Sequence, residues 1–506
     1  MNSLRKKIPN YKILACLIFV FTYVLSMMKI NSIGDLDDIG SGEIFLYSWL
    51  GIVVFLFYIF WWKKLTGKFL TPFTIFLLFI TLFNFGQCIL WAFGIHSDSE
   101  IGKRLIFSSV SADNALILKA QILYVVSYVA INTGAILLYK KKKVEDMTNI
   151  FKDDVLNDFK YKALFATSAI VSLYSIPITI FVAIQKYRYT QIFSYHDIYY
   201  GSINEYFSNP IFTIGCGLFF MSLVGLLIGS KYKKNVRYFV YSVFFVYATI
   251  TLLGGDRGEW IVPFMFLFWM HITFYKPMKR RNAMMFLVVS FLSLYIMNAI
   301  VSLRNVGISY DGFVDSLTSN DGVIVPLLTE FGQTMGISII LLSKGTVPLY
   351  GNTYLMSIPT MFGTGFANRL FGMNYVQLHT WFPLEYLGIN YGTDFSVIGE
   401  AVLNYGVLLA PLVLLVGGMI FGKIFNYPFE KNKSPFLLCF SIGAMISIVG
   451  IARSTFWISL NKIVWPLLVF GVIYFVMKRV YKRMDNHQNI DVKETIEIKE
   501  RKINYE

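Results

Sequence analysis

The segment from Gly254 to Trp260 reads GGDRGEW and joins two apolar stretches of the chain. Its glycines permit a tight turn, and Asp256 and Glu259 have the spacing of a helix N-cap and its N3 partner. A helix N-terminus favours anions, and a guanidinium such as that of Arg257 binds phosphate through paired hydrogen bonds. The segment therefore predicts either a diphosphate-binding turn or a capped hairpin whose arginine pairs with nearby carboxylates.

Two further arginines stand where apolar runs end. Arg304 lies in the sequence SLRN, and Arg453 lies in IARST. The dipole of a helix favours a cation at its C-terminus, but arginines at predicted outer helix ends depart from the positive-inside trend. Both residues are therefore candidates for binding the same diphosphate as Arg257. The simpler interpretation is that each arginine snorkels from a helix end to the membrane surface.

Aromatic and ionisable residues crowd the segment 350–394. Aromatic faces with polar edges suit sugar rings, but the same residues also suit an aromatic belt at a membrane interface. The candidates for substrate binding in and near this segment are Tyr391, Trp381 and Arg369, together with Asp256 of the glycine-rich turn.

Glu400 follows this segment, at the start of another apolar run. Ser396, Glu400 and Asn404 recur every four residues, which places them on one face of a helix. A carboxylate just inside a bilayer-spanning helix is costly unless it is paired or functional. Glu400 is therefore a candidate general base or the partner of an outer arginine, two roles that the sequence does not separate. The other candidate bases are Asp394, His379 and Glu330.

These residues must be positioned by helices that cross a membrane. The chain has 506 residues, of which 56% are hydrophobic and 15% are charged, whereas soluble domains are about 45–50% apolar and about 25% charged. This composition excludes an ordinary soluble enzyme, a disordered protein and a secreted disulfide scaffold. We expect an all-α polytopic membrane protein with about 12 transmembrane helices. The apolar runs are 13–28, 44–62, 70–94, 119–139, 163–185, 211–229, 238–253, 260–275, 284–303, 397–421, 435–451 and 460–477.

The charges between these runs predict the orientation. With a cytoplasmic N-terminus, the inner segments carry 33 Lys and Arg against 12 Asp and Glu, and the outer segments, taken together with the outer ends of the adjoining runs, carry 12 against 18. Cytoplasmic loops are enriched in Lys and Arg, so both termini are expected in the cytoplasm. The first run is expected to be a retained helix and not a removed signal peptide. The net charge of +15 then requires no nucleic-acid partner.

The predicted organisation has four parts. They are a nine-span membrane bundle (1–303), a large extracytoplasmic loop (304–396), three C-terminal spans (397–477) and a charged cytoplasmic tail (478–506). Loops of such length are usually functional. Within the loop, 323–342 reads as one amphipathic helix with a polar stripe, lying at the outer membrane surface or packed on the bundle. The stripe consists of Glu330, Gln333, Thr334 and Ser338.

Metal and cofactor chemistry have little support in the sequence. The four cysteines lie singly in apolar runs, and the five histidines are far apart, so a zinc site is not expected. No cofactor is expected either. The centres of the spans are almost free of charge, whereas coupled transporters place ionisable residues there. The ionisable residues gather at the predicted outer ends of the helices, which favours work on a large polar substrate at that face.

GGDRGEW between two spans, SLRN, the long outer loop and GTDFSVIGEAVLNYG at its return resemble the Wzy-type polymerases of O-antigen and capsule repeat units. The likeness is best over residues 238–425. It implies a metal-independent, GT-C-like helical enzyme of the bacterial cell membrane that joins undecaprenyl-diphosphate-linked oligosaccharides at the outer face. The implied partners are the lipid-linked donor and acceptor and membrane lipid. A chain-length regulator and a flippase are possible further partners.

One feature departs from the family pattern. Some members carry paired loops in which an arginine is followed, after ten residues, by glycine. Here the equivalent positions after Arg257, Arg304, Arg369 and Arg453 are Phe268, Asp315, Thr380 and Val464. The two-loop scheme of those members is therefore not transferred. The alternative functions are an O-antigen ligase-like glycosyltransferase, a lipid-linked glycan flippase or transporter, and a structural membrane partner.

Overall fold

The computed structural model describes residues 9–34, 39–140, 158–192, 209–254, 258–277, 324–345, 348–372, 376–389, 393, 395–426 and 434–503. Within these ranges the elements are helices, and pairing of extended backbone is limited to isolated bridges in 101–110. The all-α prediction is confirmed.

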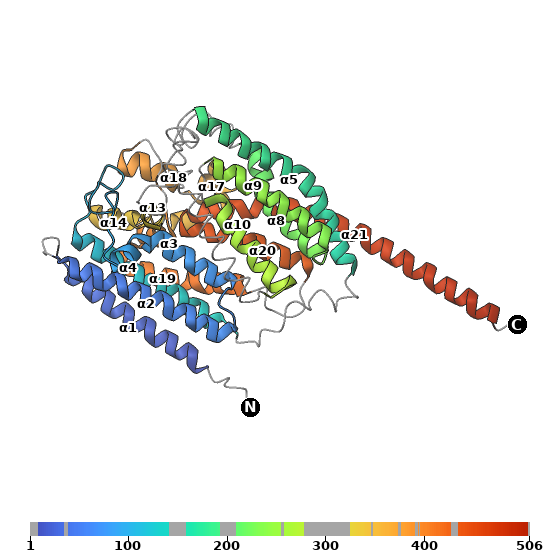
Figure 1. Ribbon diagram of the computed structural model, residues 1–506, viewed down its shortest axis with the longest axis horizontal. Helices are drawn as coiled ribbons and strands as arrows, with labels where there is room; N and C mark the ends of the chain where they lie inside the picture. Colours follow the sequence, from blue (N-terminus) through green and yellow to red (C-terminus); the bar gives the residue numbers. More distant parts are fainter. Residues whose placement is uncertain are drawn as a thin grey trace.

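The long helices form two groups that lie side by side (Figure 1). The first group contains α1 (Asn10–Ser32), α2 (Ser41–Thr66), α3 (Pro72–Ala92), α4 (Asn114–Leu138), α13 (Ile324–Gly332), α14 (Met335–Lys344) and α19 (Val397–Asn426). The second contains α5 (Asp158–Ile192), α8 (Pro210–Gly229), α9 (Lys234–Leu253), α10 (Gly258–Met270), α20 (Pro435–Val449) and α21 (Phe456–Ile503).

Short elements connect these helices. Between α14 and α19 lie α15 (Asn352–Leu355), α16 (Ser357–Thr360), α17 (Thr364–Phe371), α18 (Leu378–Trp381) and the π-helix η3 (Phe382–Leu387). The π-helix η2 (His271–Tyr275) extends α10, and the 3₁₀ turn η5 (Gly450–Ala452) follows α20. Beyond its membrane-spanning part, α21 continues as a helix that projects away from the bundle (Figure 1).

Eleven helices of the described residues are long and apolar enough to cross a membrane, so the chain is a polytopic membrane protein. Ten of them coincide with predicted runs. The run 260–275 is helical but is divided between α10 and η2, and the run 284–303 lies outside the described residues. The eleventh helical segment is Ile324–Lys344, which the sequence assigned to the outer loop.

The prediction of one amphipathic helix over 323–342 is wrong in one respect. The segment forms two helices, α13 and α14, with a turn at Gln333 and Thr334 between them. Gly332, the last residue of α13, packs closely on α3, since a Cβ atom there would lie 2.4 Å from the backbone nitrogen of Gln87. The Gln87 amide also donates to the carbonyl of Thr329 at 2.8 Å. Both helices are packed on the bundle, against α3, α4 and α19.

The close packing of α4 against α19 depends on glycine. Gly418 and Gly422 form a GxxxG pair, the spacing that lets membrane helices approach backbone to backbone. A Cβ atom on Gly418 would lie 2.2 Å from the carbonyl oxygen of Ile131, and one on Gly134 would lie 1.9 Å from that of Leu415. No side chain fits at these positions unless the two helices separate.

We expect Gly418→Val to destabilise the protein by about 1–3 kcal/mol, the usual cost of overpacking, because the new side chain must separate α4 from α19. Gly417→Val is the matched control, since a Cβ atom there meets only Phe421 at an ordinary 3.5 Å. The measurement is the apparent melting temperature in detergent. Equal losses in both variants would contradict the assigned packing.

Candidate functional site

A cavity of about 810 Å³ opens among the helices of the second group. Its walls come from α5, α8, α9, α10, α20 and α21, with Thr360 and Met361 added from the connecting segment. The lining residues are those near the ends of α5, α9 and α20 and the starts of α8, α10 and α21. The cavity therefore lies at the end of the bundle where α9 ends and α10 begins.

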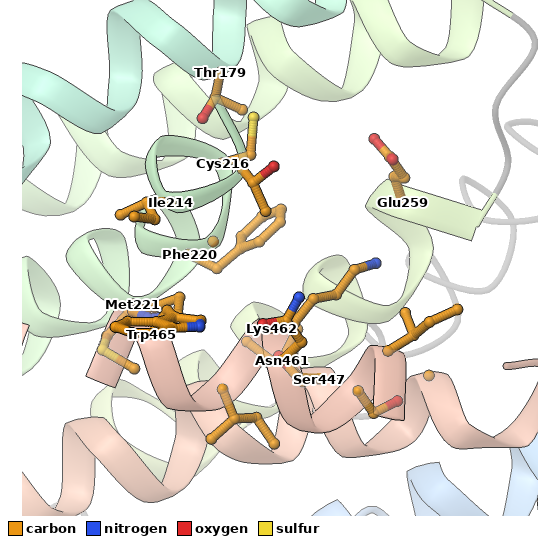
Figure 2. Close-up of a pocket in the computed structure, with 18 of the residues that line it drawn as sticks. Thr179, Ile214, Cys216, Phe220, Met221, Glu259, Ser447, Asn461, Lys462 and Trp465 are labelled. Carbon is orange, nitrogen blue, oxygen red and sulfur yellow. The ribbon is translucent and has the colours of Figure 1, made fainter. Parts of the chain in front are cut away.

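One part of the cavity is charged. The ammonium of Lys186 on α5 lies 3.0 Å from Glu259 Oε1 on α10, and the hydroxyl of Tyr247 on α9 donates to Glu259 Oε2 at 3.3 Å. Lys462 enters from the second turn of α21, and its side chain extends toward the side where Glu259 lies (Figure 2). Lys462 forms no hydrogen bond or ion pair within the described part of the chain. Two cations and one anion thus share this part of the cavity.

Glu259 is ionised at neutral pH. It lies outside the eleven candidate spans, and the charge of Lys186 lowers its pKa from the ordinary value, with a further contribution from Lys462, against the effect of burial. Ionised carboxylates in partly buried positions require such a partner. The Glu259 carboxylate is therefore held in place by the lysines around it.

The opposite part of the cavity is apolar. Met221 of α8 and Trp465 of α21 line it (Figure 2), and Gly217 allows α8 to approach Pro466, whose Cγ would lie 2.6 Å from an added Cβ atom. Pro466 lies ten residues after the first residue of α21, which is about 15 Å along a helix. That distance is about half of the roughly 30 Å hydrocarbon core of a bilayer. We call the part with Glu259 and Lys186, whose side chains are 41% and 24% exposed, the charged mouth of the cavity, and the part with Met221 and Trp465 its apolar floor.

A second feature lies beside the cavity, where α19 is broken. Gly406 has φ 74° and ψ 173°, which interrupts the helix. The carbonyls of Leu403 and Asn404 accept from the backbone N–H groups of Leu349 at 3.2 Å and Tyr350 at 2.9 Å. The break is therefore tolerated in an apolar setting because another segment satisfies the freed carbonyls.

Glu400 ties this broken helix to its neighbours. It is 1% exposed, and its Oε1 accepts from the Thr353 hydroxyl at 2.7 Å. Its Oε2 accepts from the backbone N–H of Phe456, the first residue of α21, at 2.7 Å. The Asn404 amide also donates to the Thr353 hydroxyl at 2.7 Å. The predicted shared face of Glu400 and Asn404 is confirmed, and the carboxylate stands at the N-terminus of α21, where the helix dipole favours it.

The structure describes only some of the other predicted site residues. Arg453 is half-buried three residues before Phe456, with its guanidinium 5.5 Å from the centre of the Phe83 ring. Among the described residues, Glu400 is paired with a hydroxyl and an amide and not with this arginine. Glu330 is half-buried on α13, which packs against α3.

The remaining predicted residues are dispersed or lie outside the described part. Arg369 is exposed in the last turn of α17. Trp381 packs against Tyr386, with ring centroids 5.4 Å apart. His379 lies on α18, but its side chain is outside the described residues. Asp256, Arg257, Arg304, Tyr391 and Asp394 also lie outside them.

Residues 11–484 match the family model of the O-antigen polysaccharide polymerase Wzy. The chain belongs to this family. No solved structure matches it. Members of the Wzy family polymerise oligosaccharide repeat units, so the chain is a membrane glycosyltransferase of a bacterial polysaccharide pathway, and its substrates are lipid-linked repeat units.

The sequence analysis did not single out two lysines of this Wzy protein. Lys186 directly follows the apolar run 163–185, and Lys462 lies inside the last run, 460–477. Lys462 could have been found from the sequence, because an ionisable residue within a membrane span is a functional candidate by default. Its relation to Lys186 and Glu259 could not be inferred, since the three residues lie on α21, α5 and α10.

We expect Glu400→Ala to lower the stability of the enzyme by about 3 kcal/mol, because the Phe456 N–H and the Thr353 hydroxyl lose their buried acceptors. Glu400→Gln keeps one acceptor oxygen and should cost less. The control is Glu43→Ala, which removes an exposed ion pair with Lys29 and should change stability little. Thermal unfolding in detergent measures all three, and a Glu400→Ala variant as stable as the control would contradict the assigned role.

Proposed function

We propose that this chain joins undecaprenyl-diphosphate-linked repeat units into capsule or O-antigen polysaccharide at the outer face of the cell membrane. We further propose that the cavity binds the diphosphate and the adjoining isoprenoid of one substrate. The observation that carries this proposal is the division of the cavity into a charged mouth and an apolar floor. A polyprenyl diphosphate has the same division, with an anionic head and an apolar tail.

The proposed side of the membrane rests on the charge distribution. The cavity lies at the end of the bundle where α9 ends and α10 begins. The connecting segments predicted at this end of the helices carry more acidic than basic residues. The positive-inside rule assigns such segments to the outer face and both termini to the cytoplasm.

The proposed reaction needs cations at the leaving group. A hydroxyl of one lipid-linked unit attacks the anomeric carbon of the other, a glycosidic bond forms, and the bond from that carbon to the diphosphate oxygen breaks. The departing undecaprenyl diphosphate gains negative charge, which fixed cations stabilise. Lys186 and Lys462 support this role by their position in the cavity, and we propose that Arg257, Arg304 and Arg453 assist them.

The acceptor hydroxyl must lose a proton to a base. Both oxygens of Glu400 accept hydrogen bonds from protein donors, which favours a positioning role for it over proton transfer. We propose Asp394, His379 or Glu330 as the base. We also propose that Asp256, Tyr391, Trp381 and Arg369 bind the glycan.

We expect Lys462→Met and Lys186→Met to reduce polymer formation by about 10²-fold, the usual loss when a group that stabilises developing charge is removed. Arg257→Ala and Arg304→Ala should also reduce it. Lys423→Met is the control, because Lys423 lies in the last turn of α19 and does not line the cavity. The assay is the ladder of repeat units made by purified protein from lipid-linked substrate.

Near-normal ladders from both lysine variants would remove the cavity from the mechanism. Near-normal ladders from both Arg257→Ala and Arg304→Ala would remove those arginines. The two results are independent, so the assay tests each cation set separately.

We expect purified protein in liposomes to lengthen lipid-linked glycans when no other protein is present. Repeated extension gives a ladder, because each product is again a donor. A single transfer to another acceptor would instead indicate a ligase, and movement of the lipid-linked glycan across the bilayer at constant length would indicate a flippase. The proposed face of the membrane is tested by supplying the substrate to one leaflet of the liposomes at a time.

A further inference from the structure

Glu259 occupies the place in the cavity where an anionic ligand would meet the two lysines. Its carboxylate contacts Lys186 at 3.0 Å and Tyr247 at 3.3 Å, and the Lys462 side chain extends toward the same side of the cavity (Figure 2). The three charged groups come from α10, α5 and α21. The carboxylate thus pairs with a lysine that a bound anion would otherwise contact.

The ion pair between Glu259 and Lys186 contributes little to the stability of the fold. The side chain of Glu259 is 41% exposed and that of Lys186 is 24% exposed, and ion pairs at such exposure contribute little to stability. The effect of Glu259 on a bound diphosphate is direct, because two negative charges within a few ångströms repel each other and compete for the same cations.

We propose that Glu259 is a competing anion that pairs with Lys186 when the cavity is empty and that a lipid diphosphate displaces from the two lysines. This inference rests on the proposed function of the cavity. When the reaction ends, undecaprenyl diphosphate must leave the same lysines. The carboxylate then competes for them again, which speeds product release.

The experiment measures binding of two probes to the purified full-length protein by calorimetry. Inorganic pyrophosphate tests the charged mouth alone, and farnesyl diphosphate tests the mouth and the apolar floor together. We expect Glu259→Gln to bind both probes at least about fivefold more tightly, because one repulsive charge of modest strength is removed. Glu259→Asp retains the charge and should bind as the wild type does.

Matched controls separate this effect from a general change of charge. Glu385→Gln removes an exposed carboxylate outside the cavity and should leave both affinities unchanged. Lys462→Met should weaken binding, and Lys423→Met should not. The apparent melting temperature of each variant reports whether it is folded.

A kinetic measurement tests product release. In the ladder assay we expect Glu259→Gln to slow repeated turnover more than the first transfer, because the product stays bound. A purely structural role of Glu259 would reduce both rates together.

The outcomes distinguish this inference from the proposed function. Weaker or unchanged binding by folded Glu259→Gln, with wild-type binding that depends on Lys462, would overturn the competing anion and leave the cavity assignment standing. Absence of binding to every variant would overturn both. Tighter binding by Glu259→Gln than by Glu259→Asp would support both.

Discussion

The rest of the site depends on how buried polar groups are satisfied where α19 is broken. An open helix turn inside an apolar bundle leaves carbonyls without partners, at a cost of several kcal/mol each. Here the segment at Leu349 and Tyr350 takes up two of them. That segment is then fixed, and it brings Thr353 to Glu400. The Glu400 carboxylate, through its other oxygen, fixes the N-terminus of α21.

The position of α21 has consequences for the cavity. Lys462, Trp465 and Pro466 all lie within the first three turns of α21, on the wall of the cavity. A displaced N-terminus would move the cation at the mouth and the apolar surface at the floor together. Thr360 and Met361 follow Thr353 in the connecting segment and complete the lining. Glu400 does not line the cavity, but it influences the shape of the cavity through the position of α21.

The fold could be predicted to a large extent because the length of each apolar run and the charge of each connecting segment can be read from the sequence locally. Ten predicted runs coincide with candidate spans, since a helix is the way a single segment satisfies its own backbone in lipid. The division of 324–344 into α13 and α14 could not be predicted. At this division Gly332 lies against Gln87, a residue of a helix far away in the sequence, and such a contact leaves no local pattern.

The sequence by itself determined the membrane class, the expected orientation and the family resemblance, which the match over residues 11–484 confirms. It also placed Glu400 and Asn404 on one helix face. The tertiary structure alone decided what Glu400 contacts, because Thr353 and Phe456 reach it from other segments. It alone brought Lys186, Glu259 and Lys462 to one cavity. Periodicity reports the face of one helix, whereas a site is made where several helices meet, and that depends on packing between residues distant in the chain.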